Sequence, residues 1–359
     1  MVRKEVEVKP IYQQCWISYL GAASGILKSL GKECDVVDIG GYSGWSFFVN
    51  VMKGALCPSG PTAHNAYLHM NSGVSDLGFD IESYYIPRSF PSKEGELSEE
   101  DDEKAKQLFD AVKTKIDKTN KPVILWGIPV PEYGIVYGYT EDSYLVSTFR
   151  NLHNQPDDPI RYDQIQAPGW MHFFSFNEEI SILESQRDKD AIIRAFNFAI
   201  GQIKLAYSKY ADEEGKPVPI KPLEKNSVYL TSENYVTGPN AFIEWADVLE
   251  SVGDEPHSYH GNSYVAECAL EGKITAVEFL IRLKQKYEGK RQSEYFNKAA
   301  LAFTESLKIL REFNSIFPFA FQGDMSQTKR KKGAKLLRKI HPHELEAIEH
   351  LRSALYNWT

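Results

Sequence analysis

The hydrophobic pattern of the chain changes near residue 178, and this change constrains the fold more than any other feature. Before it, apolar runs of strand length mix with loops rich in glycine and proline, whereas after it apolar residues recur at spacings of three and four. These two periodicities predict two differently built parts, and a length of 359 residues suits about two domains. We therefore expect an α+β domain over residues 1–177 and an all-α domain over residues 178–359.

Strand signals lie close together in the first part. Residues 122–127 form a continuous apolar run, and residues 133–139 and 143–149 are two strand-like runs joined by a short polar turn. Two such runs around a short turn predict a β-hairpin. The aromatic run 170–176 predicts another strand, so the first domain is expected to contain an antiparallel sheet.

Helical periodicity predicts an amphipathic helix over residues 15–30, with Gly31 at its C-terminal end. The acidic run 94–103 is expected to begin a helix that continues to about residue 118, because acidic side chains suit a helix N-terminus. The remaining expected helices cover residues 192–210, 240–250, 263–271, 275–287, 292–313 and 334–356.

Composition and charge exclude several classes of protein. The net charge of −8 argues against a general nucleic-acid binder, and neither a signal peptide nor an apolar membrane helix is visible. Four cysteines without C-x-x-C spacing favour a reduced, cytoplasmic setting. No dinucleotide or phosphate-loop fingerprint and no metal-ligand spacing occurs, so we expect no cofactor and no metal. A small-molecule or peptide substrate is the expected partner, with no nucleic acid and no membrane, and oligomerisation stays open.

Cys15 is the first residue of chemical interest, because it opens the expected helix 15–30. Backbone dipoles at a helix N-terminus lower the pKa of a thiol, which makes Cys15 a candidate nucleophile. A helix-leading cysteine followed about 100 residues later by a β-hairpin is the chain order of papain-like enzymes, whose strands carry the base and its orienting group. The alternative is a small buried hydrophobic residue without a chemical role.

Several segments resemble a known family. Residues 14–20, Gln-Cys-Trp-Ile-Ser-Tyr-Leu, resemble the nucleophile helix of the double-glycine-leader cysteine peptidases, and more closely the N-terminal-domain family of the butirosin-biosynthesis acyltransferase. The strands of the same family resemble residues 122–126, 134–139 and 144–147. Uncharacterised bacterial and archaeal members are similar at residues 40–62, 240–245 and 260–264. The resemblance covers most of the chain and implies a papain-like fold with cysteine-dependent acyl chemistry.

The chain departs from this family at the residues that complete the catalytic triad. The position of the family's histidine holds Glu132, and the position of its aspartate holds Thr148. Gln13 and Gln14 directly precede the cysteine, closer than the oxyanion-hole glutamine of the peptidases. The resemblance therefore transfers Cys15 but not a Cys-His-Asp triad.

Three interpretations of the site stay open. In the first, Glu132 is the base for Cys15, which requires burial to raise the pKa of its carboxyl group. In the second, a histidine from elsewhere enters the cleft, and the candidates are His64, His69, His172 and His260. In the third, the site has no catalytic activity and binds a ligand.

The functional expectation is a cysteine-dependent acyl or amide transferase or hydrolase that acts on a small molecule or peptide. The alternative is a catalytically inactive papain-like protein that binds a small ligand or a protein partner. The candidate catalytic residues are Cys15, Glu132, Thr148 and His260. Because aromatic residues make up 13% of the chain and gather in the segments expected around the cleft, several of them join the candidate ligand-binding residues. That set is Gln14, Trp16, Tyr42, Trp45, His64 and Tyr133.

Overall fold

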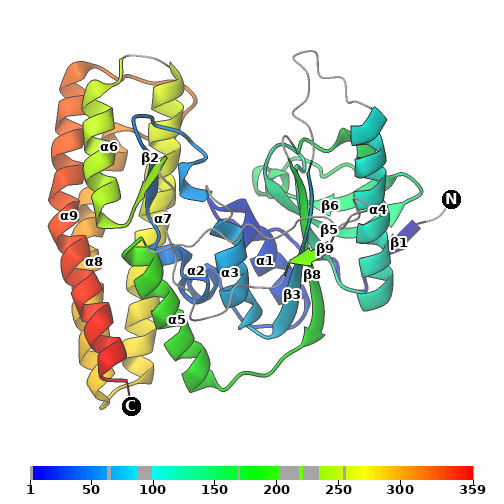
Figure 1. Cartoon of the computed structure of the whole chain (residues 1–359), viewed down its shortest axis with the longest axis horizontal. Coiled ribbons are helices and arrows are strands. Elements are labelled where there is room, and N and C mark those ends of the chain that lie inside the picture. The colour runs from blue at the N-terminus through cyan, green and yellow to red at the C-terminus, as the bar shows by residue number, and fades with distance from the viewer. Residues whose placement is uncertain are drawn as a thin grey trace. The chain divides into compact units, whose positions relative to one another are not determined.

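The computed structural model describes residues 3–62, 66–87, 99–167, 170–201, 218–220, 234–253 and 256–358. The chain packs as two compact units (Figure 1). Unit 1 consists of Met1–Ile39, Val74–Ser181 and Ala206–Leu223, and unit 2 of Gly40–Gly73, Ile182–Leu205 and Glu224–Thr359. Unit 1 combines a sheet with helices, and unit 2 is mainly helical, so the chain is an α+β protein.

Unit 1 is built on an antiparallel sheet with the strand order β7-β6-β5-β4-β8-β3-β9, and β1 pairs with β5 beside this path. The predicted strand at 122–127, the predicted hairpin and the strand at 170–176 are confirmed as β4, β5–β6 and β8. The strands are β1 (Arg3–Glu5), β3 (Phe79–Pro87), β4 (Val123–Trp126), β5 (Tyr133–Thr140), β6 (Ser143–Ser147), β7 (Ile160–Arg161), β8 (Trp170–Glu179) and β9 (Val218–Ile220).

Two helices, α1 (Ser18–Ser29) and α4 (Glu99–Thr119), cover opposite faces of this sheet (Figure 1). Neighbouring residues of β8 show why both faces need a cover. Phe173 belongs to the apolar cluster that contains the buried side chains of α4, whereas the ring of Phe174 lies 4.7 Å from that of Tyr19 on α1. Because successive side chains of a strand point to opposite faces, β8 is apolar on both sides and requires a helix on each.

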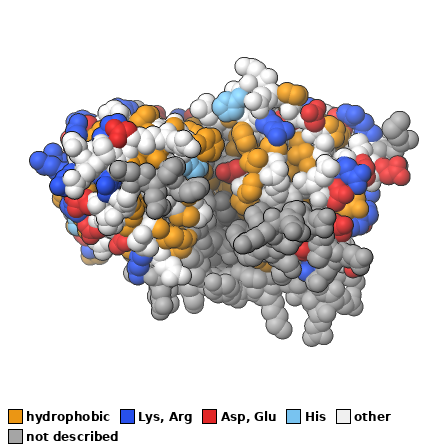
Figure 2. Space-filling view, turned by 90° about the horizontal axis from the view of Figure 1, so that it is seen from above, with side chains coloured by type: hydrophobic (Ala, Val, Ile, Leu, Met, Phe, Trp, Pro, Cys, Tyr) orange, Lys and Arg blue, Asp and Glu red, His pale blue; other side chains and the backbone are white. Residues whose placement is uncertain are grey.

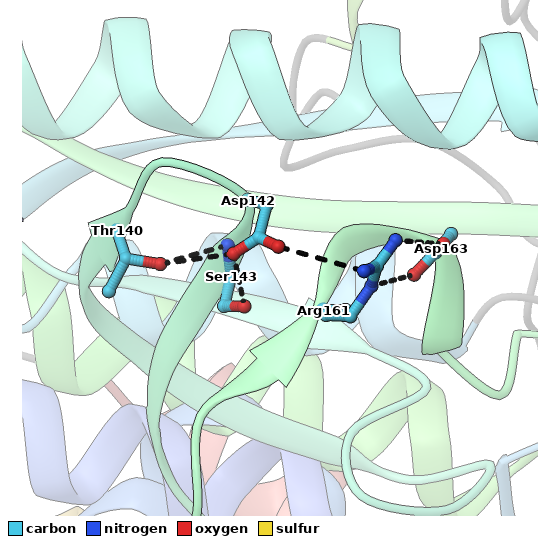
Figure 3. A network of polar contacts seen from close by, with 5 residues as sticks. All are labelled: Thr140, Asp142, Ser143, Arg161 and Asp163. Carbon is cyan, nitrogen blue, oxygen red and sulfur yellow. Dashed lines mark hydrogen bonds and ion pairs between the residues drawn. The ribbon is translucent and has the colours of Figure 1, made fainter. Parts of the chain in front are cut away.

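The turn of the hairpin is held by the polar network shown in Figure 3. Thr140 Oγ1 accepts the backbone N–H of Ser143 at 3.2 Å, and the Ser143 hydroxyl donates to Asp142 at 2.8 Å. Arg161 on β7 lies 3.8 Å from Asp142 and donates to Asp163 at 3.1 and 2.8 Å. With about 3.4 Å per residue, these contacts lie roughly 24 Å along β5 from its first residue, so they fix the far end of the hairpin.

Unit 2 contains long helices that pack on one another. The predicted helices 263–271 and 275–287 are one helix, because a single interior glycine such as Gly272 costs a helix only about 1 kcal/mol and does not end it. The helices are α5 (Glu184–Ala199), α6 (Pro239–Ser251), α7 (Pro256–Lys286), α8 (Arg291–Ile316) and α9 (Gln327–Tyr356). Segment Gly40–Gly73 adds the end of α2 (Val36–Ser43), β2 (Asn50–Met52), which pairs with β10 (Tyr235–Thr237), and most of α3 (Ala66–Ser75).

The boundary between the two parts differs from the single one expected at residues 177/178. Segment 40–73 belongs to the helical unit, although it precedes most strands of the sheet in sequence. The Ser46 and Thr275 hydroxyls lie 2.6 Å apart, and the ring of Phe47 lies 5.7 Å from that of Phe303. These contacts with α7 and α8 place the segment in the core of unit 2, which chain order alone could not show.

A close backbone crossing in unit 1 gives a first prediction. An added Cβ at Gly25 of α1 would lie 2.3 Å from the backbone oxygen of Ile11 and 2.9 Å from Ile135 Cδ1. Helix propensity alone favours Gly25→Ala by about 1 kcal/mol, but overpacking reverses the sign. We expect this substitution to lower the free energy of unfolding by about 2 kcal/mol in urea titrations. Gly253→Ala, which meets no atom within 4 Å, is the control, and a more stable Gly25→Ala protein would contradict the prediction.

A buried ion pair in unit 2 gives a second testable prediction. Lys273 Nζ lies 2.8 Å from Glu344 Oε2, and these side chains are only 1% and 4% exposed. The same ammonium group lies 4.5 Å from the ring centre of Phe303. Because each charge has lost its hydration, removing one partner leaves the other uncompensated.

Glu344→Gln should therefore lower the free energy of unfolding by about 3–5 kcal/mol, measured by urea titration. The double variant Lys273→Met/Glu344→Leu should lose much less, because neither charge remains. Lys298→Met is the control. The Lys298 side chain pairs with Glu294 and is 44% exposed, and an exposed ion pair contributes only about 0.5 kcal/mol to stability. Equal losses in the control and in Glu344→Gln would contradict the prediction.

Candidate functional site

The carboxyl group of Glu132 meets the first residue of α1. Ser18 Oγ donates a hydrogen bond to Glu132 Oε2, and the backbone N–H of Tyr133 donates to the same Ser18 oxygen at 3.0 Å. Ser18 is 6% exposed, and Glu132 is partly buried. The start of β5 is thus joined to the N-terminus of α1 through one serine hydroxyl.

The turn before β5 fixes the backbone of Glu132. Its carbonyl oxygen accepts the N–H groups of Gly127 at 2.9 Å and Ile128 at 3.2 Å, and its own N–H donates to the Val130 oxygen at 2.5 Å. Gly127 has φ +89°, a conformation that glycine adopts without strain, and its carbonyl accepts the N–H of Gln166 at 2.8 Å. The carboxyl group therefore extends from a backbone that is bonded on several sides.

The protonation of Glu132 is set by two opposing influences. Burial raises the pKa of the Glu132 carboxyl group above its ordinary value, and the hydrogen bond from Ser18 acts in the opposite direction. The net change is upward. A carboxyl group with a raised pKa is a better proton acceptor near neutral pH than a solvated one. This is the change that the first interpretation of the sequence required.

Cys15 lies just before α1 and is partly exposed. The predicted helix start at Cys15 is wrong: α1 begins at Ser18, and Ile17 is its N-cap residue with φ −95° and ψ 104°. The chain before Cys15 contacts the end of β6, where the N–H of Tyr12 donates to Ser147 Oγ at 3.0 Å. Ser18 is three positions after Cys15, so their Cα atoms lie within about 11 Å of each other.

Tyr133 and His172 form a buried polar pair on the face of the sheet that α1 covers. The Tyr133 hydroxyl lies 2.9 Å from His172 Nδ1, and the rings of Tyr19 and Trp126 lie 5.8 and 4.9 Å from that of Tyr133. Burial lowers the pKa of His172 to about 3, so its imidazole is neutral at ordinary pH. Tyr133, expected at the surface of a ligand cleft, is fully buried and belongs to this aromatic core.

Thr148 has a structural role in the loop after β6. Its hydroxyl donates to Asp157 Oδ1, and its N–H donates to Asp157 Oδ2 at 2.9 Å. The same hydroxyl accepts the N–H of Arg150 at 3.2 Å and so caps the short 3₁₀ helix Phe149–His153. These hydrogen bonds satisfy the polar atoms of the buried Thr148 side chain. The described contacts of Thr148 do not include the imidazole of His172.

The other candidate residues are distributed over both units. Gln14 is exposed and Trp16 half-buried in unit 1, whereas Tyr42 and Trp45 are buried in unit 2. The Tyr42 hydroxyl donates to Asp188 at 2.7 Å. The structure thus does not place these four residues in one described site.

The described contacts of this cluster include none of the other three candidate histidines. His260 on α7 of unit 2 stacks on the ring of Phe321 at 4.7 Å. His64 lies outside the described residues, and so does the side chain of His69. Among the predicted residues, the described contacts join Glu132, Tyr133 and His172 and add Ser18, which the sequence did not single out.

Several side chains of the basic run 329–339, near the start of α9, form ion pairs with acidic side chains of unit 2. Lys329 lies 3.1 Å from Asp324, Lys332 lies 3.4 Å from Glu312, and Arg338 contacts Asp247 and Glu250 at 2.6 and 2.9 Å. Figure 2 shows positive and negative side chains interspersed on the visible face. The paired charges favour the interpretation of this run as a solvated helix start.

No family model matches the chain, and no curated protein matches it. Within the described ranges, no group of three or more His, Cys, Asp or Glu side chains is placed to hold a metal ion. None of the helices in the same ranges is long and apolar enough to cross a bilayer. The papain-like interpretation stays a prediction that the residues and the geometry of unit 1 have to support.

The buried imidazole of His172 predicts a pH dependence of stability. Its pKa is about 3 in the folded chain and about 6.5 when unfolded, so protonation favours unfolding. The stabilisation is complete above pH 6.5 and is lost as the pH falls towards 3. Between pH 7 and pH 5 the wild-type free energy of unfolding should fall by about 2 kcal/mol more than that of His172→Gln, measured by urea titration.

Tyr133→Phe is the control for this measurement, because it removes the hydroxyl at Nδ1 but keeps the imidazole. It should retain the wild-type difference between the two pH values. Equal pH dependence in wild type and His172→Gln would show that His172 is not buried as a neutral side chain.

Proposed function

We propose that unit 1 is a papain-like domain that catalyses cysteine-dependent acyl or amide transfer, or hydrolysis, on a small molecule or peptide. Cys15 is the nucleophile, and the Glu132 carboxylate is its base. The observation that carries the proposal is the contact between Glu132 and the N-terminus of α1, three residues after Cys15. A helix packed on an antiparallel sheet, with the base beside the helix start, is also the arrangement that the sequence resemblance implies.

The chemistry follows from these two groups. Glu132 takes the proton of the Cys15 thiol, and the thiolate adds to the carbonyl carbon of the substrate. The amide groups at the start of α1 provide positive potential for the oxyanion. Collapse of the tetrahedral intermediate expels the amine or alcohol, which takes the proton from Glu132, and leaves a thioester on Cys15. Water or an acceptor amine then attacks this thioester and restores the thiol.

A second candidate is a catalytically inactive papain-like protein that binds a small ligand or a protein partner. Two observations favour it. His172 is neutral and bonded to Tyr133 inside the sheet, and Thr148 caps a short helix, so neither acts as the family's imidazole or its orienting carboxylate. In this case Glu132 contributes a hydrogen-bonding group to the ligand and has no effect on the reactivity of Cys15.

Alkylation by iodoacetamide separates the two candidates. Base catalysis typically contributes about 100-fold or more, so Glu132→Gln should slow the alkylation of Cys15 at pH 7 by at least about tenfold. The rate is measured for each cysteine separately by mass spectrometry of the digested protein. A Cys15 rate that is unchanged in Glu132→Gln and no faster than that of a free thiol would exclude the enzymatic proposal and support the binding protein.

The chain supplies its own controls. Cys57 is also partly exposed but belongs to unit 2, so its rate should be the same in wild type and Glu132→Gln. Cys34 and Cys268 are buried, and burial raises the pKa of the Cys34 thiol to about 12, so both should be alkylated slowly as long as the protein is folded. Fast labelling of these buried thiols reports unfolding.

A further inference from the structure

The hydroxyl of Ser18 is committed to two partners at once. Its oxygen accepts the N–H of Tyr133 at 3.0 Å, and its single proton is directed to Glu132 Oε2. A backbone N–H can only donate, so the serine oxygen is the acceptor on that side. The proton of the hydroxyl is then satisfied in this buried place by an ionised carboxylate, which only accepts.

This bond also decides which carboxylate oxygen is available. Ser18 donates its proton to Oε2 of Glu132, and Oε1 of the same carboxylate can accept a proton or hydrogen bond from another group. Because the backbone of Glu132 is fixed by the turn before β5, the bond from Ser18 determines the remaining rotation of the side chain. The carboxylate is thereby held at the start of α1 with one defined oxygen to receive a proton.

We propose that Ser18 is a positioning residue for Glu132: its hydroxyl orients the carboxylate and keeps it ionised for proton transfer from Cys15. This inference rests on the proposed function, and it gives a role to a residue that was not among the candidate catalytic or ligand-binding residues. Ser18 acts through Glu132 and does not touch the substrate.

The surroundings of Ser18 argue against a nucleophilic role for its own hydroxyl. The side chain is 6% exposed, and one lone pair of its oxygen is engaged by the N–H of Tyr133. A nucleophile needs access to the carbonyl carbon of its substrate, and the low exposure of Ser18 opposes such access. The same two contacts are the ones that a positioning residue requires.

The experiment measures two quantities in wild type, Ser18→Ala and Ser18→Thr, and the first of them also in Glu132→Gln. The first is the pH profile of Cys15 alkylation by iodoacetamide. The second is the titration of the Glu132 carboxyl carbon by ¹³C NMR, which requires no catalytic activity. In Ser18→Ala the lost hydrogen bond should move the Glu132 titration to higher pH and lower the alkylation rate at pH 7 by about tenfold. Ser18→Thr retains the hydroxyl, so its Glu132 titration and its Cys15 alkylation rate should match those of the wild type.

Each contrary result has a distinct meaning. An unchanged titration and profile in Ser18→Ala, with slow alkylation in Glu132→Gln, would overturn the role of Ser18 and leave the proposed function intact. An unchanged Cys15 rate in Glu132→Gln would overturn the proposed function and this inference with it. Covalent labelling of Ser18 by a fluorophosphonate would show a nucleophile and overturn the positioning role. Slow labelling of Cys34 confirms that each variant is folded.

Discussion

The two-sided burial of the central strands is the constraint on which unit 1 depends. Phe173 and Phe174 are adjacent on β8, yet each is fully buried because the sheet has a helix on both faces. Apolar side chains on both faces drive α1 and α4 onto the sheet, since either face would otherwise be exposed to water. The packing of α1 then brings the N-terminus of that helix against the turn before β5, and the contact between Ser18 and Glu132 follows from it.

Burial acts differently on two ionisable side chains of unit 1. His172 lies among aromatic rings and bonds to the Tyr133 hydroxyl, and burial keeps it neutral. Glu132 is only partly buried and receives a hydroxyl proton, so burial raises its pKa while the bond limits the rise. Under the proposed function, a carboxyl group accepts the proton that an imidazole accepts in the papain-like pattern, and the histidine of this sheet is part of the core.

The sequence predicts the parts of this fold that local pattern determines. The hairpin has two apolar runs around a polar turn, and it appears as β5 and β6. β1 is three residues of charged sequence that pair with residues 138–140 of β5, beyond the part of β5 that pairs with β4, so no local pattern marks it. Segment 40–73 precedes most of the sheet in sequence but packs on α7 and α8, because contacts such as that of Ser46 with Thr275 span 229 residues.

The candidate site shows the same limit of prediction from local sequence pattern. Glu132 could be found by counting along the hairpin, but its partner Ser18 lies 114 residues away, and no spacing relates the two. One local signal was present: serine is favoured near the N-terminus of a helix, which would have placed the start of α1 later than Cys15. With the helix start at Ser18, the cysteine belongs to the chain that approaches the helix. Under the proposed function, the reactivity of Cys15 then rests on Glu132 more than on the helix dipole, because the effect of the dipole fades within one turn.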